Sequence, residues 1–79
     1  MPTILRVNGF RVYFYSHEPG EPPHVHVDRG GATAKVWLES MTLAGNAGFS
    51  AGELRDVLHL IRIRRVDCLE AWHGFFHPG

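Results

Sequence analysis

The hydrophobic pattern of the chain changes its period once, and this change constrains the fold more than any other feature. Over the first half, apolar and polar side chains alternate, which is the two-residue period of a β-strand. From Leu54 onward, apolar side chains recur at helical spacing and form one stripe. Strands followed by a helix predict an α+β fold. A chain of 79 residues is enough for one domain, which we place at residues 1–79.

Turn-forming residues divide the first half into four expected strands. Asn8-Gly9 stands between two alternating runs and predicts a tight hairpin, because both central residues of that turn need a positive φ. A proline-containing loop follows, and Gly30-Gly31 marks the next turn. The expected strands cover residues 3–7, 10–16, 24–29 and 33–39, with a short strand or loop over 41–47.

Ser50 and Glu53 mark the start of the helix. Ser50 can cap the helix while the Glu53 side chain returns to the Ser50 amide, an arrangement known as the capping box. The apolar stripe continues to about Phe76, so we expect one long C-terminal helix over 50–76. It would pack on the sheet face that carries Phe10, Val12, Phe14, Val25, Val27, Ala34, Val36 and Leu38. The predicted fold is therefore a four-stranded, mainly antiparallel sheet with one long helix packed on one face.

The other face of the predicted sheet, here called the open face, carries cations among aromatic rings. Its members are Arg11, Tyr13, Tyr15, His24, His26, Lys35 and Trp37. Bases of single-stranded RNA can stack on such rings while the cations meet phosphates. Cross-strand packing of the rings, or a face that binds a partner protein or a second copy, explains the same pattern. The alternation therefore predicts a binding face and leaves its occupant open.

His24 and His26 are two residues apart on one expected strand, so both side chains should leave the same face. One imidazole could accept a proton and the other donate one in RNA cleavage, with Lys35 or Arg11 stabilising the charge on phosphorus. The pair could instead hold a metal with a third ligand, or be exposed strand residues without chemistry. In the cleavage interpretation, changing either histidine to alanine abolishes activity and leaves the fold intact.

Arg65 interrupts the apolar stripe of the helix. Its guanidinium group needs a partner, which is either a carboxylate or a bound anion such as phosphate. The available carboxylates are Glu21, Asp28 and Glu39. His73 and His77 have the helical spacing of a metal-binding pair, but polar residues near a helix C-terminus also interact with its dipole. We assign no metal site and no cofactor.

The composition of the chain constrains its binding partners, its cellular location and its oligomeric state. The formal net charge is zero with histidines neutral, so binding to nucleic acid must come from a local patch. Cys68 is the one cysteine, and no segment has the pattern of a signal peptide or a membrane span, so we expect the cytoplasm. The core of so short a chain is thin, and this favours association into a homo-oligomer.

Six segments resemble the small bacterial domain of unknown function 4160 family, and the Glu-Pro-Pro-His-Val-His string is the most specific of them. They are Met1-Pro2-Thr3, Phe14-Tyr15-Ser16, Glu21-Pro22-Pro23-His24-Val25-His26-Val27, Ala34-Lys35-Val36-Trp37-Leu38-Glu39, Gly48-Phe49-Ser50 and Leu69-Glu70-Ala71-Trp72. Members are often encoded beside another small domain, an arrangement similar to a toxin–antitoxin pair. The resemblance implies a cognate small partner protein and action on RNA. Its pattern includes His24, His26, Lys35, Trp37 and Arg65.

These observations predict a small protein of a toxin–antitoxin-like two-gene module that binds RNA through the open face, with cleavage as a further option. A protein-interaction or oligomerisation module is the alternative, and a metal-binding domain using His24 and His26 is the third. The residues expected to carry catalysis are His24, His26 and Lys35. Those expected to bind nucleic acid are Arg11, Tyr13, Tyr15, Trp37 and Arg65.

Overall fold

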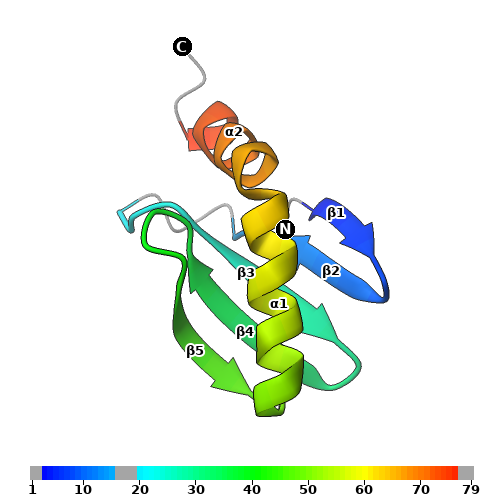
Figure 1. Ribbon diagram of the computed structural model, residues 1–79. Helices are drawn as coiled ribbons and strands as arrows, with labels where there is room; N and C mark the ends of the chain where they lie inside the picture. The colour runs from blue at the N-terminus through cyan, green and yellow to red at the C-terminus, as the bar shows by residue number, and fades with distance from the viewer. Residues whose placement is uncertain (1–2, 16–19, 77–79) are drawn as a thin grey trace.

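A computed structural model of the chain describes residues 3–15 and 20–76. Five strands form one antiparallel sheet in which each strand pairs with the next along the chain (Figure 1). The strands are β1 (Thr3–Val7), β2 (Phe10–Tyr13), β3 (His24–Arg29), β4 (Ala32–Trp37) and β5 (Thr42–Ala47). Two helices follow, α1 (Ala51–Ile63) and α2 (Arg65–Phe76).

The predicted class is confirmed, but the strand count is wrong. The segment that was expected to be a short strand or loop is β5, which pairs with β4 and makes the sheet five-stranded. Leu43 is its one large apolar side chain and all six residues are exposed, so the hydrophobic alternation that reveals the other strands is weak here. The hairpin turn is as predicted, with Asn8 at φ 50° and Gly9 at φ 81°.

The prediction of a single long helix is also wrong, because the chain bends at Arg64 between α1 and α2. Sequence periodicity continues across this bend, since Val57, Ile61, Cys68 and Trp72 are all buried. A straight helix over the whole segment would be about 40 Å long and would extend well past strands of about 20 Å. The bend lets α2 leave the line of α1 and pack near the end of the sheet (Figure 1). There Phe14 meets the rings of Phe75 and Phe76.

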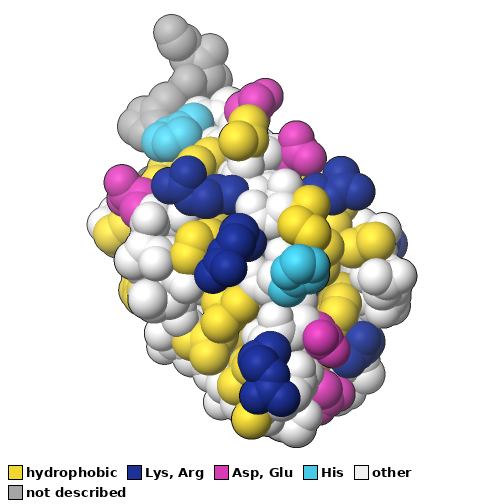
Figure 2. All heavy atoms as spheres, viewed as in Figure 1, with side chains coloured by type: hydrophobic (Ala, Val, Ile, Leu, Met, Phe, Trp, Pro, Cys, Tyr) yellow, Lys and Arg dark blue, Asp and Glu magenta, His cyan; other side chains and the backbone are white. Residues whose placement is uncertain are grey.

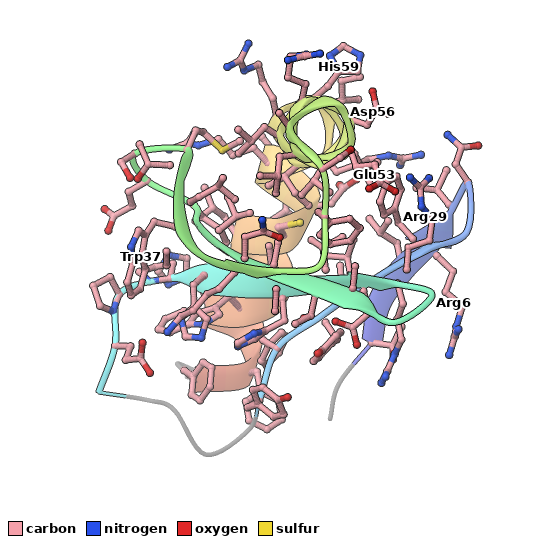
Figure 3. All side chains as sticks on the ribbon, turned by 90° about the horizontal axis from the view of Figure 1, so that it is seen from below. Arg6, Arg29, Trp37, Glu53, Asp56 and His59 are labelled. Carbon is pink, nitrogen blue, oxygen red and sulfur yellow. The ribbon has the colours of Figure 1, made fainter. Side chains whose placement is uncertain are left out.

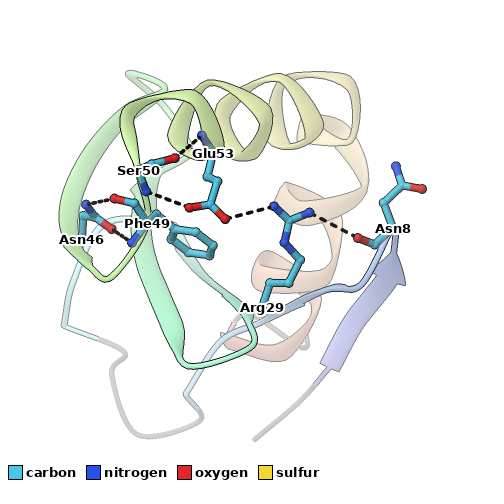
Figure 4. Close-up of polar contacts among 6 residues, drawn as sticks. All are labelled: Asn8, Arg29, Asn46, Phe49, Ser50 and Glu53. Carbon is cyan, nitrogen blue, oxygen red and sulfur yellow. Dashed lines mark hydrogen bonds and ion pairs between the residues drawn. The ribbon is translucent and has the colours of Figure 1, made fainter.

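The start of α1 follows the sequence prediction. The Ser50 hydroxyl accepts a hydrogen bond from the Glu53 amide at 3.1 Å, and the Glu53 carboxylate accepts one from the Ser50 amide at 2.9 Å (Figure 4). The same carboxylate lies 3.5 Å from the guanidinium of Arg29, whose other nitrogen points to the Asn8 carbonyl. These contacts connect the first hairpin, the end of β3 and the helix. They fix α1 over one face of the sheet.

The core lies between that face and the helices. It contains the predicted sheet residues Phe10, Val12, Val25, Val27, Ala34, Val36 and Leu38, together with Phe49, Val57, Ile61 and Cys68. Among residues 3–15 and 20–76, no helix is long and apolar enough to cross a membrane.

Candidate binding face

The strand register places the predicted open-face residues in rows that run across the sheet. The first row joins Arg6 of β1, Arg11 of β2, Asp28 of β3 and Thr33 of β4. The second joins Tyr13, His26 and Lys35, and reaches Gly45 of β5. The third joins His24, Trp37 and Thr42. Every residue that the alternation assigned to this face on β2, β3 and β4 therefore lies there, and Asp28 and Thr33, which it did not assign, lie there as well.

The rings of the open face are in contact with one another. His26 is stacked on Tyr13 with centroids 5.4 Å apart, and meets Tyr15 edge to face at 4.6 Å. On its other side, the His26 centroid lies 5.3 Å from that of His24. The His24 ring is in turn 5.7 Å from Trp37. His26, Tyr15 and Trp37 are half-buried, so each still offers part of its ring to a ligand.

Both cations predicted on the open face, Arg11 and Lys35, lie over a ring. The Arg11 guanidinium is 4.6 Å from the Tyr13 centroid, and the Lys35 ammonium is 4.7 Å from the Trp37 centroid. Lys35 also forms a salt bridge with Glu21, which comes from the segment before β3. The ammonium is therefore held between a carboxylate and an indole, and a phosphate that approached it would compete with Glu21.

Tyr13 is buried, unlike the other tyrosine of the open face. Its hydroxyl donates to the Asp28 carboxylate at 3.0 Å, and the Thr33 hydroxyl donates to the same carboxylate. Burial, then a hydrogen bond with Tyr15 and the nearby Asp28 charge, raises the pKa of the Tyr13 hydroxyl above its usual range. Tyr13 thus supports the face from below, and its ring is not available for stacking with a base.

His24 is on the predicted face but is fully buried, with 0% of its surface exposed. Its Nδ1 lies 2.9 Å from the Pro22 carbonyl oxygen. The two histidines therefore differ in access: His26 reaches the surface, whereas His24 packs beneath Trp37 and His26. An RNA strand lying on the face would meet one imidazole, which weighs against a two-histidine acid–base mechanism.

Arg6 belongs to the open face and was missed by the sequence analysis. It is exposed, and its direct cross-strand partner is Arg11. Figure 3 shows Arg6 extending away from the sheet on the side opposite to Asp56 and His59 of α1. The signal was available in the sequence. A two-residue Asn8-Gly9 turn makes Val7 pair with Phe10 and therefore Arg6 with Arg11.

The Arg65 side chain forms a structural contact with the backbone. Its Nε donates to the Leu38 carbonyl at 2.8 Å, so the polar partner at the start of α2 is a backbone oxygen. The expected ion pair with Glu21, Asp28 or Glu39 is not what anchors this nitrogen. The contact fixes α2 to the end of β4, close to Trp37 in sequence.

A shallow hollow of about 200 Å³ lies where the open face reaches β5. His26 and Lys35 stand at one side of it, and Gly45 and Ala47 form the other. Gly45 and Ala47 have little or no side chain, so the surface is low there. In the part of the chain that the structure describes, no three His, Cys, Asp or Glu side chains gather as a metal site. His77 lies outside the described residues.

A second hollow, of about 400 Å³, lies on the helix side, between the first hairpin and α1. Apolar side chains, including Leu60 and Ile63, line it, and Arg29 and Arg64 stand among its polar residues. Both of these arginines already face carboxylates at 3.5 Å, those of Glu53 and Asp67 respectively. None of the residues that the sequence predicted for catalysis or binding lines it.

Comparison with known proteins agrees with the resemblance seen in the sequence. The model of a family described as Domain of unknown function (DUF4160) matches residues 9–73, which include β2 through most of α2. The chain belongs to this family. No curated protein and no solved structure matches the chain.

Proposed function

We propose that the open face binds single-stranded RNA, with its phosphates over the arginines of the first hairpin and its bases on the half-buried rings. The observation that carries the proposal is the direct pairing of Arg6 with Arg11. Like charges opposite each other in an antiparallel pair are destabilising. Asp28 lies across from Arg11 on the other side but not across from Arg6, so an anion over the two arginines would relieve their repulsion. A phosphate backbone supplies that charge at regular intervals.

The rings continue the same surface from the arginines toward β4. Tyr15, His26 and Trp37 are half-buried and follow one another through ring contacts, with His24 beneath. Stacking of a base on an aromatic side chain contributes about 1–3 kcal/mol and tolerates any base. The face therefore suits an unpaired strand better than a duplex, whose bases are already stacked.

The arrangement supports binding better than cleavage. The predicted acid–base pair needs two accessible imidazoles, and His24 is buried against the Pro22 carbonyl. In our proposal His26 stacks with a base, and Lys35 reaches a phosphate after leaving Glu21. The protein would then act in a two-gene module by occupying RNA, with a cognate small partner protein competing for the same face.

Fluorescence anisotropy with a labelled oligouridine tests the proposal. Arg6→Ala and Arg11→Ala should each weaken binding and reduce the salt slope by about 1, because each removes one phosphate contact. Trp37→Ala should weaken binding by about 5- to 150-fold, which corresponds to the loss of one stacked base. The matched control is Arg55→Ala, which removes an exposed arginine from α1. Unchanged affinity in the three face variants, or equal loss in the control, would refute RNA binding at this face.

A protein partner is the second candidate, and one observation favours it. The Lys35 ammonium is paired with Glu21, and the Asp28 carboxylate lies directly across from Arg11, so the charge of these two cations is already partly balanced within the protein. Half-buried rings on a neutral surface are typical of protein interfaces. If the chain binds no RNA at low salt but Trp37→Ala abolishes capture of the cognate partner protein, this second function replaces the first.

A further inference from the structure

We propose that a second copy of the chain pairs with the free edge of β5 in antiparallel fashion, so that two open faces join into one continuous surface. The pairing itself does not depend on RNA. That the joined surface binds RNA rests on the proposed function.

The β5 edge carries no charged side chain that would repel another strand. All six residues from Thr42 to Ala47 are exposed, and no ionisable side chain or proline occurs between Ser40 and Gly52. Sheet proteins usually protect a free edge with charge, proline, a β-bulge or a covering segment, because its backbone groups can otherwise pair with another strand. Of these devices β5 has the bulge, since the register with β4 shifts at Ala44, and the residues on either side of it pair regularly with β4. The described part of the chain places no helix across this edge, since α1 lies over the sheet face (Figure 1). The edge is therefore available for a strand.

The difference in charge between the two edges of the sheet indicates that another copy of the chain pairs with β5. In an antiparallel pair formed around a two-fold axis, β5 lies against itself, and each residue near the centre faces the same region of the other copy. An uncharged strand can do this without repulsion. The opposite edge of the sheet cannot, because β1 carries exposed Arg6. Neutrality on one edge and charge on the other direct self-association to β5.

Apolar contacts beside the strand add to the backbone pairing. Leu43 is 36% exposed and pairs with Val36, so it lies on the helix side of the sheet. Figure 2 shows hydrophobic side chains reaching the surface beside α1. Pairing of one short strand with few apolar contacts buries less area than a standard interface of about 1,600 Å², so we expect a dimer that dissociates at micromolar concentrations.

The dimer would complete the shallow hollow at β5. An antiparallel in-sheet pair places the open faces of both copies on the same side. Gly45 and Ala47 would then lie near the axis, and the two hollows would meet across them. His26 of each copy would stand on opposite sides of a joint trough, separated by five strand spacings, or about 24 Å. One RNA strand could cross both copies.

Sedimentation equilibrium without RNA tests the pairing over a wide concentration range. We expect wild type to shift from monomer to dimer, and Ala44→Lys to raise the dissociation constant by about tenfold or more, because the two lysines would then lie close to each other near the two-fold axis. The matched control is Ile63→Lys, which places the same charge at a 65% exposed position on α1 and should leave the dimer unchanged. A wild type that stays monomeric throughout, or an Ala44→Lys variant that dimerises as wild type does, overturns the proposal.

Oxidative cross-linking gives a second readout if Ala44→Lys folds poorly. Cys68 is buried, so Ala44→Cys introduces an accessible thiol at the centre of β5. We expect a disulfide-linked dimer from Ala44→Cys and none from Ile63→Cys. Equal yields from both variants would overturn the pairing. The joint surface is tested separately: wild type should bind a long oligouridine more tightly than a short one, and Ala44→Lys should lose that difference. If no oligouridine binds but the dimer forms, the RNA proposal fails and the pairing stands.

Discussion

His24→Ala should unfold much of the protein, whereas His26→Ala should not. Both histidines are on one face of β3, and sequence reasoning expected either substitution to leave the fold intact. The structure distinguishes them, because His24 is 0% exposed and His26 is half-buried. Alanine at position 24 would remove a ring that is enclosed by His26, Trp37 and the Pro22 carbonyl.

The expected cost follows from burial and from the lost hydrogen bond. Truncating a large, fully buried side chain costs about 2–5 kcal/mol, depending on how far the site collapses. Leaving the Pro22 carbonyl without its imidazole partner adds about 1–3 kcal/mol if water cannot reach it. A core of this size rarely supplies more than about 3–5 kcal/mol in total, so the loss is comparable to the whole stability. For half-buried His26 we expect about 1 kcal/mol.

Urea denaturation followed by far-ultraviolet circular dichroism measures the difference. With a slope of about 1 kcal/mol per molar urea, His24→Ala should lower the midpoint by about 2 M or more, or abolish the transition. His24→Phe is the matched control, since it keeps an aromatic ring in the site, slightly larger than imidazole, and loses the hydrogen bond to the Pro22 carbonyl. A His24→Ala midpoint within about 0.5 M of wild type, or a larger loss in His26→Ala, would show that the reasoning from burial is wrong.

Three further predictions follow from the helix cap and from two raised pKa values. Ser50→Ala should lower the free energy of unfolding by about 1 kcal/mol in thermal melts, and a smaller loss in Glu53→Ala would be consistent with the reciprocal bond. Burial raises the pKa of the Cys68 thiol to about 11, so iodoacetamide should modify it at neutral pH only after denaturation. Burial also raises the pKa of Tyr13, so the stability it contributes is present below the unfolded value of 10.0 and declines as pH rises beyond it. Tyr13→Phe should remove that alkaline decline in urea midpoints measured at increasing pH, and an unchanged profile would contradict the assignment.

The sequence predicts which residues lie on the candidate binding face, but it does not predict which of them are exposed to solvent. Period-two alternation places Arg11, His26, Lys35 and Trp37 on one face whatever the rest of the chain does. Arg6 could have been added from the register of the Asn8-Gly9 turn. No local rule, however, distinguishes a buried from an exposed residue on the same face of a strand. That difference depends on neighbours from other strands.

The sequence by itself determined the local structure, because the signals for it lie within a few residues of one another. A hairpin turn needs only two residues that accept positive φ, and the Ser50–Glu53 capping box spans one helical turn. Tertiary structure decided the features that depend on distant partners. The weakly patterned strand β5 exists because β4 offers it a backbone edge, and the helix bends at Arg64 because α2 must pack near the end of a short sheet. The burial of His24 belongs to the same class, since Trp37 reaches it only when β3 and β4 are paired.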